Sequence, residues 1–344
     1  MFRTMYKGTL PPIKDPGSKR EREDDDNNND NSEHRDALIN DDDSVIETAL
    51  WSDYFDSRTD VNVEGRGTFR VYECNTNVVN DGHLVVFVHG GGHTSLSWAL
   101  AADLMKKHMN PQSQFRLMAY DARAHGETKA INNEDLSIGA LVDDLVTLIN
   151  QYAAGITANA GGGSPLKVVL VGHSMGGAVV VRASKSGRVL NQCAVVVIDV
   201  VEGTAMSALP AMRSILARRP AHFKSESDAI KWSIKSDNLR NIESARVSIP
   251  SQIRQSGDKY VWITDLAPTE RFWSEWFQGL SKEFLESRVA KLLILAGSDR
   301  LDKEMTIGQM MGKFQLALFP TCGHVIQEDN PKATADTLLE FLKR

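Results

Sequence analysis

The sequence has few cysteines and no long apolar run. Its three cysteines, Cys74, Cys193 and Cys322, are widely spaced and odd in number, so they suggest neither a disulfide framework nor a cluster of zinc ligands. No apolar run approaches the roughly 20 residues of a membrane-spanning helix. These absences predict a chain that folds in a reducing compartment and has no membrane-spanning segment.

An excess of basic residues is also missing. Lys and Arg number 39 against 45 Asp and Glu, for a formal net charge of −6, which argues against a general nucleic-acid-binding protein. The first twenty residues carry basic side chains, but prolines interrupt them and they lack the apolar core of a signal peptide. We therefore expect no nucleic-acid partner, no membrane partner and a cytoplasmic or nuclear location.

The N-terminal segment has almost nothing to bury. Residues 21–43 are mostly Asp, Asn and Glu, and such a segment cannot offset the entropy lost on ordering. We predict that residues 1–48 form a disordered acidic tail. The aromatic side chains of Trp51, Tyr54 and Phe55 mark the place where the fold begins.

What the sequence has in quantity is short apolar runs separated by helix-like segments. Strands are predicted at residues 68–73, 84–88, 115–120, 167–171, 194–198, 291–296 and 314–319. Helical spacing of apolar residues follows at 135–152, and residues 331–342 begin with proline, as a closing helix can. This alternation predicts an α/β protein with a mostly parallel sheet that helices cover on both faces.

Ser174 lies in a G-x-S-x-G sequence at residues 172–176, between a predicted strand and a helix-capable segment. This is the nucleophile-elbow motif of α/β hydrolases. A serine at such a sharp turn has strained backbone, and neighbours without side chains let strand and helix pack closely enough to expose its Oγ. The next N–H, that of Met175, would point at a developing oxyanion. The motif alone also occurs by chance, so the surrounding sequence must show whether Ser174 is a catalytic residue.

The strand at 84–88 supplies that context. It ends in His-Gly-Gly-Gly-His at residues 89–93, which matches the oxyanion loop after the third strand of the same fold. A plain glycine turn is the alternative, but two matched motifs in the correct order argue against it. The N–H of Gly91 or of Gly92 would complete an oxyanion hole with Met175.

A general base and an acid follow in the chain order of this fold. His324 follows the last predicted strand, where the base belongs. Asp299, after the preceding strand, and Asp199, one strand earlier, are both candidates for the acid, and spacing alone leaves both open. His324 would take the Ser174 proton while the acid orients the imidazole. This chemistry needs no metal and no organic cofactor.

A further motif, D-x-R-x-H-G, starts at Asp121 and contains Arg123 and His125. We expect both side chains to brace loops rather than to react.

Residues 204–287 contain several tryptophans and helical periodicity but no comparable apolar strand. This segment is predicted to be a helical cap that selects the substrate. The cap divides the hydrolase core into residues 49–203 and 288–344.

Several longer runs resemble the protein phosphatase methylesterase family, from about Trp51 to the C-terminus. The runs lie at residues 89–93, 96–98, 125–128, 172–177, 198–206, 243–248, 301–303 and 306–310. The resemblance implies a serine carboxylesterase that acts through an acyl-enzyme. Its substrate would be the methyl ester on the C-terminal leucine of the protein phosphatase 2A catalytic subunit, and a stable complex with that subunit is also implied. In this family the acid matches Asp199, so we favour Asp199 and keep Asp299 in reserve.

The chain departs from the family at residues 256–259, where some relatives carry a long acidic insertion and this chain is short. Two other functions stay open. One is a small-molecule hydrolase of the same fold, and the other is an inactive protein that sequesters the phosphatase.

Overall fold

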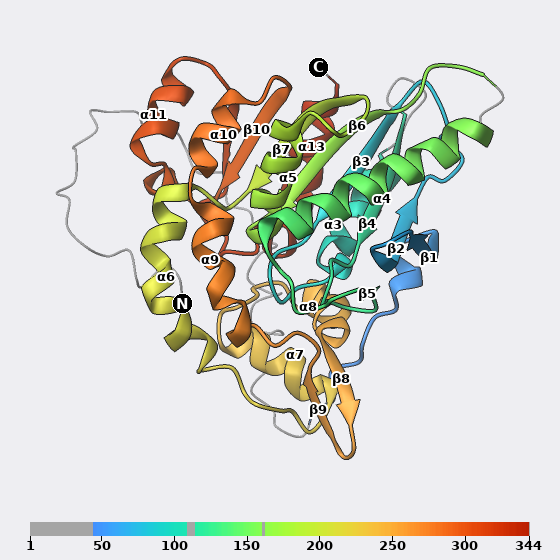
Figure 1. Cartoon of the computed structure of the whole chain (residues 1–344). Coiled ribbons are helices and arrows are strands. Elements are labelled where there is room, and N and C mark those ends of the chain that lie inside the picture. The colour runs from blue at the N-terminus through green and yellow to red at the C-terminus, as the bar shows by residue number, and fades with distance from the viewer. Residues whose placement is uncertain (1–43, 109–113, 160–161, 344) are drawn as a thin grey trace, which may run out of the picture.

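The centre of the computed structural model, which describes residues 44–108, 114–159 and 162–343, is a nine-stranded sheet (Figure 1). The strand order is β1-β2-β4-β3-β6-β7-β10-β11, and β5 pairs with β2. The strands are β1 (Ser57–Val63), β2 (Gly67–Cys74), β3 (His83–Val88), β4 (Phe115–Tyr120), β5 (Lys129–Ala130), β6 (Lys167–His173), β7 (Gln192–Ile198), β10 (Ala290–Leu295) and β11 (Gln315–Leu318).

Pairing is parallel from β4 through β11 and antiparallel where β2 meets β1, β4 and β5. The central strands β3, β6 and β7 are buried along most of their length, as expected for apolar runs covered on both sides. The predicted mostly parallel sheet is therefore confirmed. The sequence analysis missed β1, whose side chains are mostly exposed and lack an apolar pattern, and the very short β5.

Helices cover both faces of this sheet, and a separate apolar core fills each side. One core joins the sheet to α4 (Ile138–Asn159), α5 (Met175–Ser186) and α10 (Leu280–Glu286). The other joins it to α3 (Ala99–Lys107) and α13 (Pro331–Leu342). The carboxyl ends of the parallel strands thus meet at one rim, where functional side chains can gather.

The segment predicted to be a helical cap, residues 204–287, contains helices and also a β-hairpin. Its elements are α6 (Glu202–Leu216), α7 (Glu226–Lys235), α8 (Ile242–Ser248), β8 (Ile253–Ser256), β9 (Lys259–Trp262) and α9 (Glu270–Phe277), followed by α10. The β8–β9 hairpin, which turns at Gly257 with φ +64°, was not predicted because its strands are only four residues long. Figure 1 shows α7 and this hairpin beyond one end of the sheet. The remaining helices are α11 (Lys303–Met310) and α12 (Ile326–Asp329), and the 3-10 turns span Trp51–Asp53, Ser95–Trp98, Pro250–Gln252, Ala267–Thr269 and Ser298–Arg300.

The predicted disordered tail lies mostly outside the described residues, since residues 1–43 are not among them. For residues 44–48 the prediction is wrong. Ile46 is buried in an apolar cluster with side chains of α7 and α8, and its N–H donates to Ser227 Oγ at 2.9 Å. This contact, together with the hydrogen bond that Arg246 Nε donates to the Glu47 carbonyl at 2.8 Å, holds the segment against α7 and α8.

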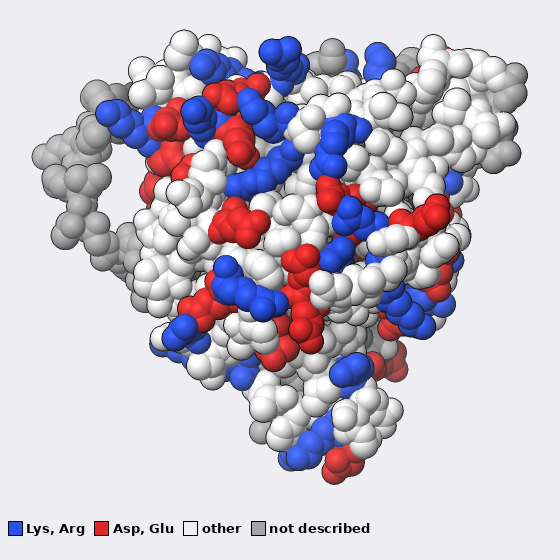
Figure 2. All heavy atoms as spheres, viewed as in Figure 1, with Lys and Arg blue, Asp and Glu red and all other residues white. Residues whose placement is uncertain are grey.

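Charged side chains of both signs are interspersed over the face drawn in Figure 2. Several of them form ion pairs, for example Lys185 with Glu286 at 2.6 Å and Arg188 with Asp143 at 2.7 Å. Across the described ranges, no helix has the length and apolar character needed to cross a membrane.

Candidate active site

Ser174 stands at the turn between β6 and α5 with φ +52° and ψ −117°. A non-glycine residue rarely adopts positive φ, so this backbone is strained and the surrounding fold must hold it. The flanking glycines make that possible. A Cβ on Gly172 would lie 2.2 Å from the Gly176 carbonyl oxygen, and a Cβ on Gly176 would lie 2.2 Å from that of Val88.

His324 and Asp199 are joined, although 125 positions separate them in the chain. The imidazole Nδ1 of His324 donates to Asp199 Oδ2 at 2.8 Å. The Asp199 side chain is fully buried, and its Oδ1 accepts from the Ala296 N–H at 3.1 Å. Because Nδ1 carries the proton in this bond, Nε2 of the neutral ring is the nitrogen that can accept one.

Asp299 has a different position. It lies in the Ser298–Arg300 turn with an exposed side chain, and within the described residues it makes no hydrogen bond or ion pair with His324. Both aspartates follow neighbouring parallel strands, but only Asp199 reaches the imidazole.

Ser174 and His324 line one cavity of about 720 Å³ at the carboxyl rim of the sheet. No hydrogen bond joins the Ser174 hydroxyl to the His324 imidazole in the described part of the chain. Such contacts are often long in the absence of substrate and tighten when it binds. The His324 backbone is held by His173, whose Nε2–H donates to the His324 carbonyl at 2.9 Å. The cap supplies apolar wall to the same cavity through Leu209, Met212, Trp232, Trp273, Trp276 and Phe277.

The cap also fixes the turn that carries His324. Asp329 accepts from the N–H of Gly323 at 2.5 Å and from that of Arg240 at 2.9 Å. Ser248 of α8 donates to the carboxyl group of Glu328. Burial raises the pKa of Glu328 well above its usual range, because the charged form of a carboxyl group loses its hydration when it is enclosed.

The prediction for the oxyanion loop is wrong for one of its two candidate donors. Gly92 was a candidate donor, but its N–H donates to His125 Nε2 at 2.9 Å and is therefore not free for an oxyanion. The N–H groups of Gly91 and Met175 donate to no other group among the described residues, and both residues line the cavity. The geometry thus favours Gly91 with Met175 as the donor pair.

Two buried histidines hold this loop as neutral acceptors. His125 Nδ1–H donates to the Arg123 carbonyl and His89 Nδ1–H donates to the Gly90 carbonyl, each at 2.8 Å. Their Nε2 atoms accept from Gly92 and Ala122, each at 2.9 Å. Burial lowers the pKa of His89 to about 4 and that of His125 to about 3.

These shifts predict a loss of stability in acid. In the unfolded chain both histidines take up protons below about pH 6.5, whereas in the folded chain they stay neutral down to about pH 4 and 3. The free energy of unfolding should therefore fall as pH drops below 6.5, by up to about 1.4 kcal/mol per pH unit for each histidine. Urea unfolding of His125→Gln should show a shallower slope between pH 4.5 and 6. The variant His222→Gln, which removes an exposed imidazole, is the control for the substitution itself. Equal slopes for His125→Gln and the wild type would contradict the assignment.

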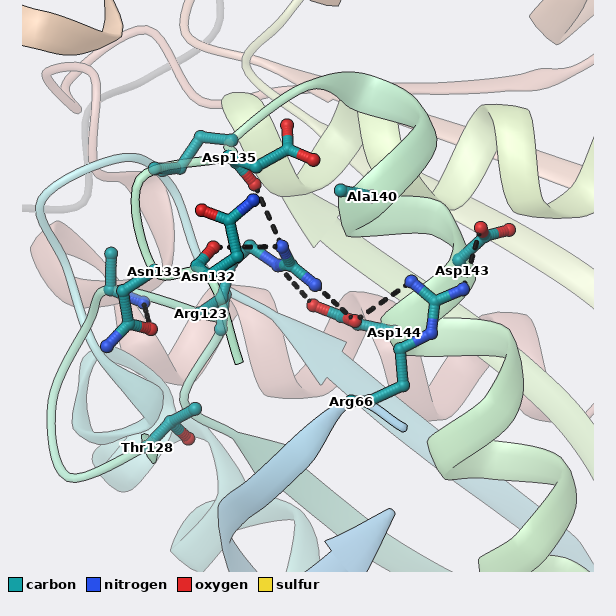
Figure 3. A network of polar contacts seen from close by, with 12 residues as sticks. Arg66, Arg123, Thr128, Asn132, Asn133, Asp135, Ala140, Asp143 and Asp144 are labelled. Atoms are coloured by element: carbon teal, nitrogen blue, oxygen red, sulfur yellow. Dashed lines mark hydrogen bonds and ion pairs between the residues drawn. The ribbon is translucent and has the colours of Figure 1, made fainter. Parts of the chain in front are cut away.

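Arg123 braces the segment behind this loop, in agreement with the role predicted for it (Figure 3). Its guanidinium binds the Asp144 carboxylate of α4 with two hydrogen bonds, at 2.5 and 2.7 Å, and both side chains are buried. A third bond reaches the Asp135 carbonyl at 3.0 Å. Arg66 adds a second cation near Asp144, at 3.6 Å.

Sequence reasoning missed one residue that contacts the candidate acid. Arg300 forms an ion pair with the same Asp199 Oδ2 that binds His324. No motif signals this contact, because it depends on how the turn after β10 approaches β7. Within the described ranges, no group of three His, Cys, Asp or Glu side chains is arranged to hold a metal ion.

Comparison with known proteins agrees with this geometry. The model of the "Alpha/beta hydrolase family" matches residues 85–337. A solved E-2-(acetamidomethylene)succinate hydrolase superposes with a TM-score of 0.66 at 20% identity, over 84% of this chain and 99% of that one. A solved M. tuberculosis esterase gives a TM-score of 0.59 at 16% identity, over 91% and 97%. The fold and the strand–serine–helix turn are those of an α/β hydrolase.

Sequence relatives narrow this class. A Dictyostelium discoideum protein named "Probable protein phosphatase methylesterase 1" is 49% identical over 342 residues, which cover 96% of this chain and 98% of the relative. The human "Protein phosphatase methylesterase 1" is 40% identical over 340 residues, which cover 86% and 84%. The chain belongs to the protein phosphatase methylesterase family, an esterase family of α/β hydrolases.

Proposed function

We propose that this chain removes the methyl ester from the C-terminal leucine of the protein phosphatase 2A catalytic subunit, with Ser174, His324 and Asp199 as its catalytic triad. The observation that carries the proposal is the bond from His324 Nδ1 to buried Asp199, at the edge of the cavity that Ser174 also lines. The names of the relatives support a methylated phosphatase as substrate.

The reaction starts when His324 Nε2 takes the proton of Ser174 and Oγ attacks the ester carbonyl carbon. The N–H groups of Gly91 and Met175 bind the oxygen that becomes negative, and such donors contribute on the order of 3–4 kcal/mol each. Asp199 keeps the proton on Nδ1 and stabilises the imidazolium.

The tetrahedral intermediate then collapses. The imidazolium gives its proton to the methoxy oxygen, the carbon–oxygen bond breaks and methanol leaves, so that the acyl group is bound to Ser174. Water, deprotonated by His324, attacks the acyl carbon. The products are a free C-terminal carboxylate and the regenerated Ser174 hydroxyl.

The cavity fits an acyl group that is the end of a protein chain. Its volume of about 720 Å³ lies in the range of ligand pockets. Apolar side chains of α6 and α9 form one wall, which suits a leucine side chain. The neutral methyl ester adds no charge to be desolvated.

Methanol release tests this proposal. We expect the chain to release methanol from intact methylated phosphatase and from a short peptide with a C-terminal leucine methyl ester. The intact protein should have a kcat/KM at least about 10-fold higher, because contacts remote from the ester contribute binding energy. Methanol from neither substrate, with the phosphatase still bound, would indicate a sequestering protein. A strong preference for small non-peptide esters would indicate a small-molecule hydrolase.

A further inference from the structure

Arg219 lines the cavity, and among the described residues no acidic side chain lies within ion-pair distance of its guanidinium, although Asp265 is close enough to act on its charge. The guanidinium makes no hydrogen bond with the described residues, and the one hydrogen bond that Arg219 donates there comes from its backbone N–H to the Leu216 carbonyl. The guanidinium carbon instead lies 3.8 Å from the centre of the Trp262 ring. A cation over a tryptophan face is attracted by the ring, but this contact uses none of the five N–H donors of the guanidinium.

Trp262 is itself held in place. Its indole N–H donates to the Pro220 carbonyl at 2.8 Å. Its ring packs edge-on against Phe223, with centroids 5.3 Å apart, and against Trp232, with centroids 5.6 Å apart. Arg219 therefore rests on a rigid aromatic surface, and little side-chain freedom is left to lose when a ligand binds.

Two other arginines of the cavity differ from Arg219. Arg240 donates to both carboxylate oxygens of Asp237, at 3.0 and 3.1 Å, and Arg300 is paired with Asp199. Burial lowers the pKa of Arg219 to about 10, and Asp265 opposes this only in part. Arg219 thus stays charged at neutral pH but is incompletely solvated. An anion from outside the chain would compensate the lost hydration by accepting its N–H hydrogen bonds.

The position of Arg219 relates it to the reacting end of a substrate. A Cβ on Gly92 would lie 3.7 Å from Arg219 Nη1, so the guanidinium adjoins the loop that contains Gly91. An extended chain advances about 3.3–3.6 Å per residue. A peptide whose last carbonyl binds at Gly91, and whose preceding residues follow the cavity wall that contains Arg219, would bring one of its last few side chains to the guanidinium.

From this placement, and resting on the proposed function, we propose that Arg219 binds the side-chain carboxylate of an acidic residue located two to four positions from the methylated end of the substrate. The terminus cannot supply the anion, because methylation removes its charge. A carboxylate matches the planar guanidinium with two parallel hydrogen bonds.

Paired peptides test this inference. Each pair has a C-terminal leucine methyl ester, and its members differ at one of these positions by Asp against Asn. For the wild-type chain, kcat/KM should favour the Asp peptide by at least about 10-fold at one position, mainly through KM. In Arg219→Gln the ratio of the two kcat/KM values, Asp peptide over Asn peptide, should fall to about one. Arg219→Lys should keep part of the preference, because lysine retains the positive charge but lacks the planar pair of N–H donors.

Arg213→Gln is the matched control, because Arg213 is an exposed arginine of α6 that pairs with Glu270. It should keep the wild-type ratio. No preference at any position in the wild type, or a preference that survives in Arg219→Gln, would overturn the inference. The inference would also be overturned if Arg219→Gln lowered kcat equally for both peptides and left the ratio of their kcat/KM values unchanged. That result would place the guanidinium at the oxyanion.

Failure of the proposed function would look different. If the wild-type chain hydrolyses none of the peptides, calorimetric binding of the same pairs still decides the inference. Tighter binding of the Asp peptide that disappears in Arg219→Gln supports it, and equal binding within every pair refutes it.

Discussion

Replacing Ser174 with alanine is expected to lower kcat for methanol release by on the order of 10⁵–10⁶-fold, because the substitution removes the atom that bonds to the acyl carbon. The measurement is single-turnover methanol release from a methylated phosphatase terminus. Residual hydrolysis should come only from substrate binding and from the oxyanion donors of Gly91 and Met175.

The variant should fold normally. Alanine keeps the Cβ of Ser174, and the positive φ is imposed by the packing of β6 against α5 rather than by the hydroxyl. Ser184→Ala is a suitable control, since Ser184 lies on α5, the helix that follows Ser174, and its buried Oγ has no hydrogen-bond partner among the described residues. The control should retain full turnover. Near-normal turnover in Ser174→Ala, with an unchanged melting temperature, would remove Ser174 from the mechanism.

The strands that carry the site could be predicted from the sequence. Each of β3, β6, β7 and β10 contains a short apolar run, mostly Val, Leu and Ile, that is buried on both faces, and such runs need little context to be recognised. Residues that directly follow these strands must lie on one rim, because the strands are parallel. For this reason the strand pattern alone is enough to place Ser174 and Asp199 on that rim.

Contacts that depend on the path of a loop could not be predicted. The sequence reads the same whether Gly91 or Gly92 supplies the oxyanion donor. Only the approach of His125, from a loop 33 positions away, shows that the Gly92 N–H already donates a hydrogen bond. The ion pair of Arg300 with Asp199 likewise spans 101 positions. Arg219 carries no sequence signal at all, because its significance lies in the tryptophan beneath it and in the absence, among the described residues, of an acidic side chain at ion-pair distance.

Replacing the acid of the triad is expected to have the second largest effect on kcat, and it distinguishes the two candidate aspartates. Asp199→Asn should lower kcat by on the order of 10³–10⁴-fold, since an amide NH₂ facing His324 Nδ1 favours the wrong imidazole tautomer and cannot neutralise the imidazolium. Asp299→Asn should change kcat by less than about 3-fold, because its exposed carboxylate makes no hydrogen bond or ion pair with the imidazole in the described part of the chain. Steady-state methanol release from the two variants gives the ranking directly, and the reverse ranking would assign the acid role to Asp299.

Loss of charge at Asp199 also removes the anion that faces Arg300, and this second effect must be separated from catalysis. Arg300 is only 17% exposed, so an unpaired guanidinium there should destabilise the fold. The double variant Asp199→Asn with Arg300→Gln no longer has that unpaired cation. If its melting temperature recovers while kcat stays low, the carboxylate acts on His324 and not merely on the packing of the turn after β10. Recovery of kcat together with stability would instead make Asp199 a structural partner of Arg300.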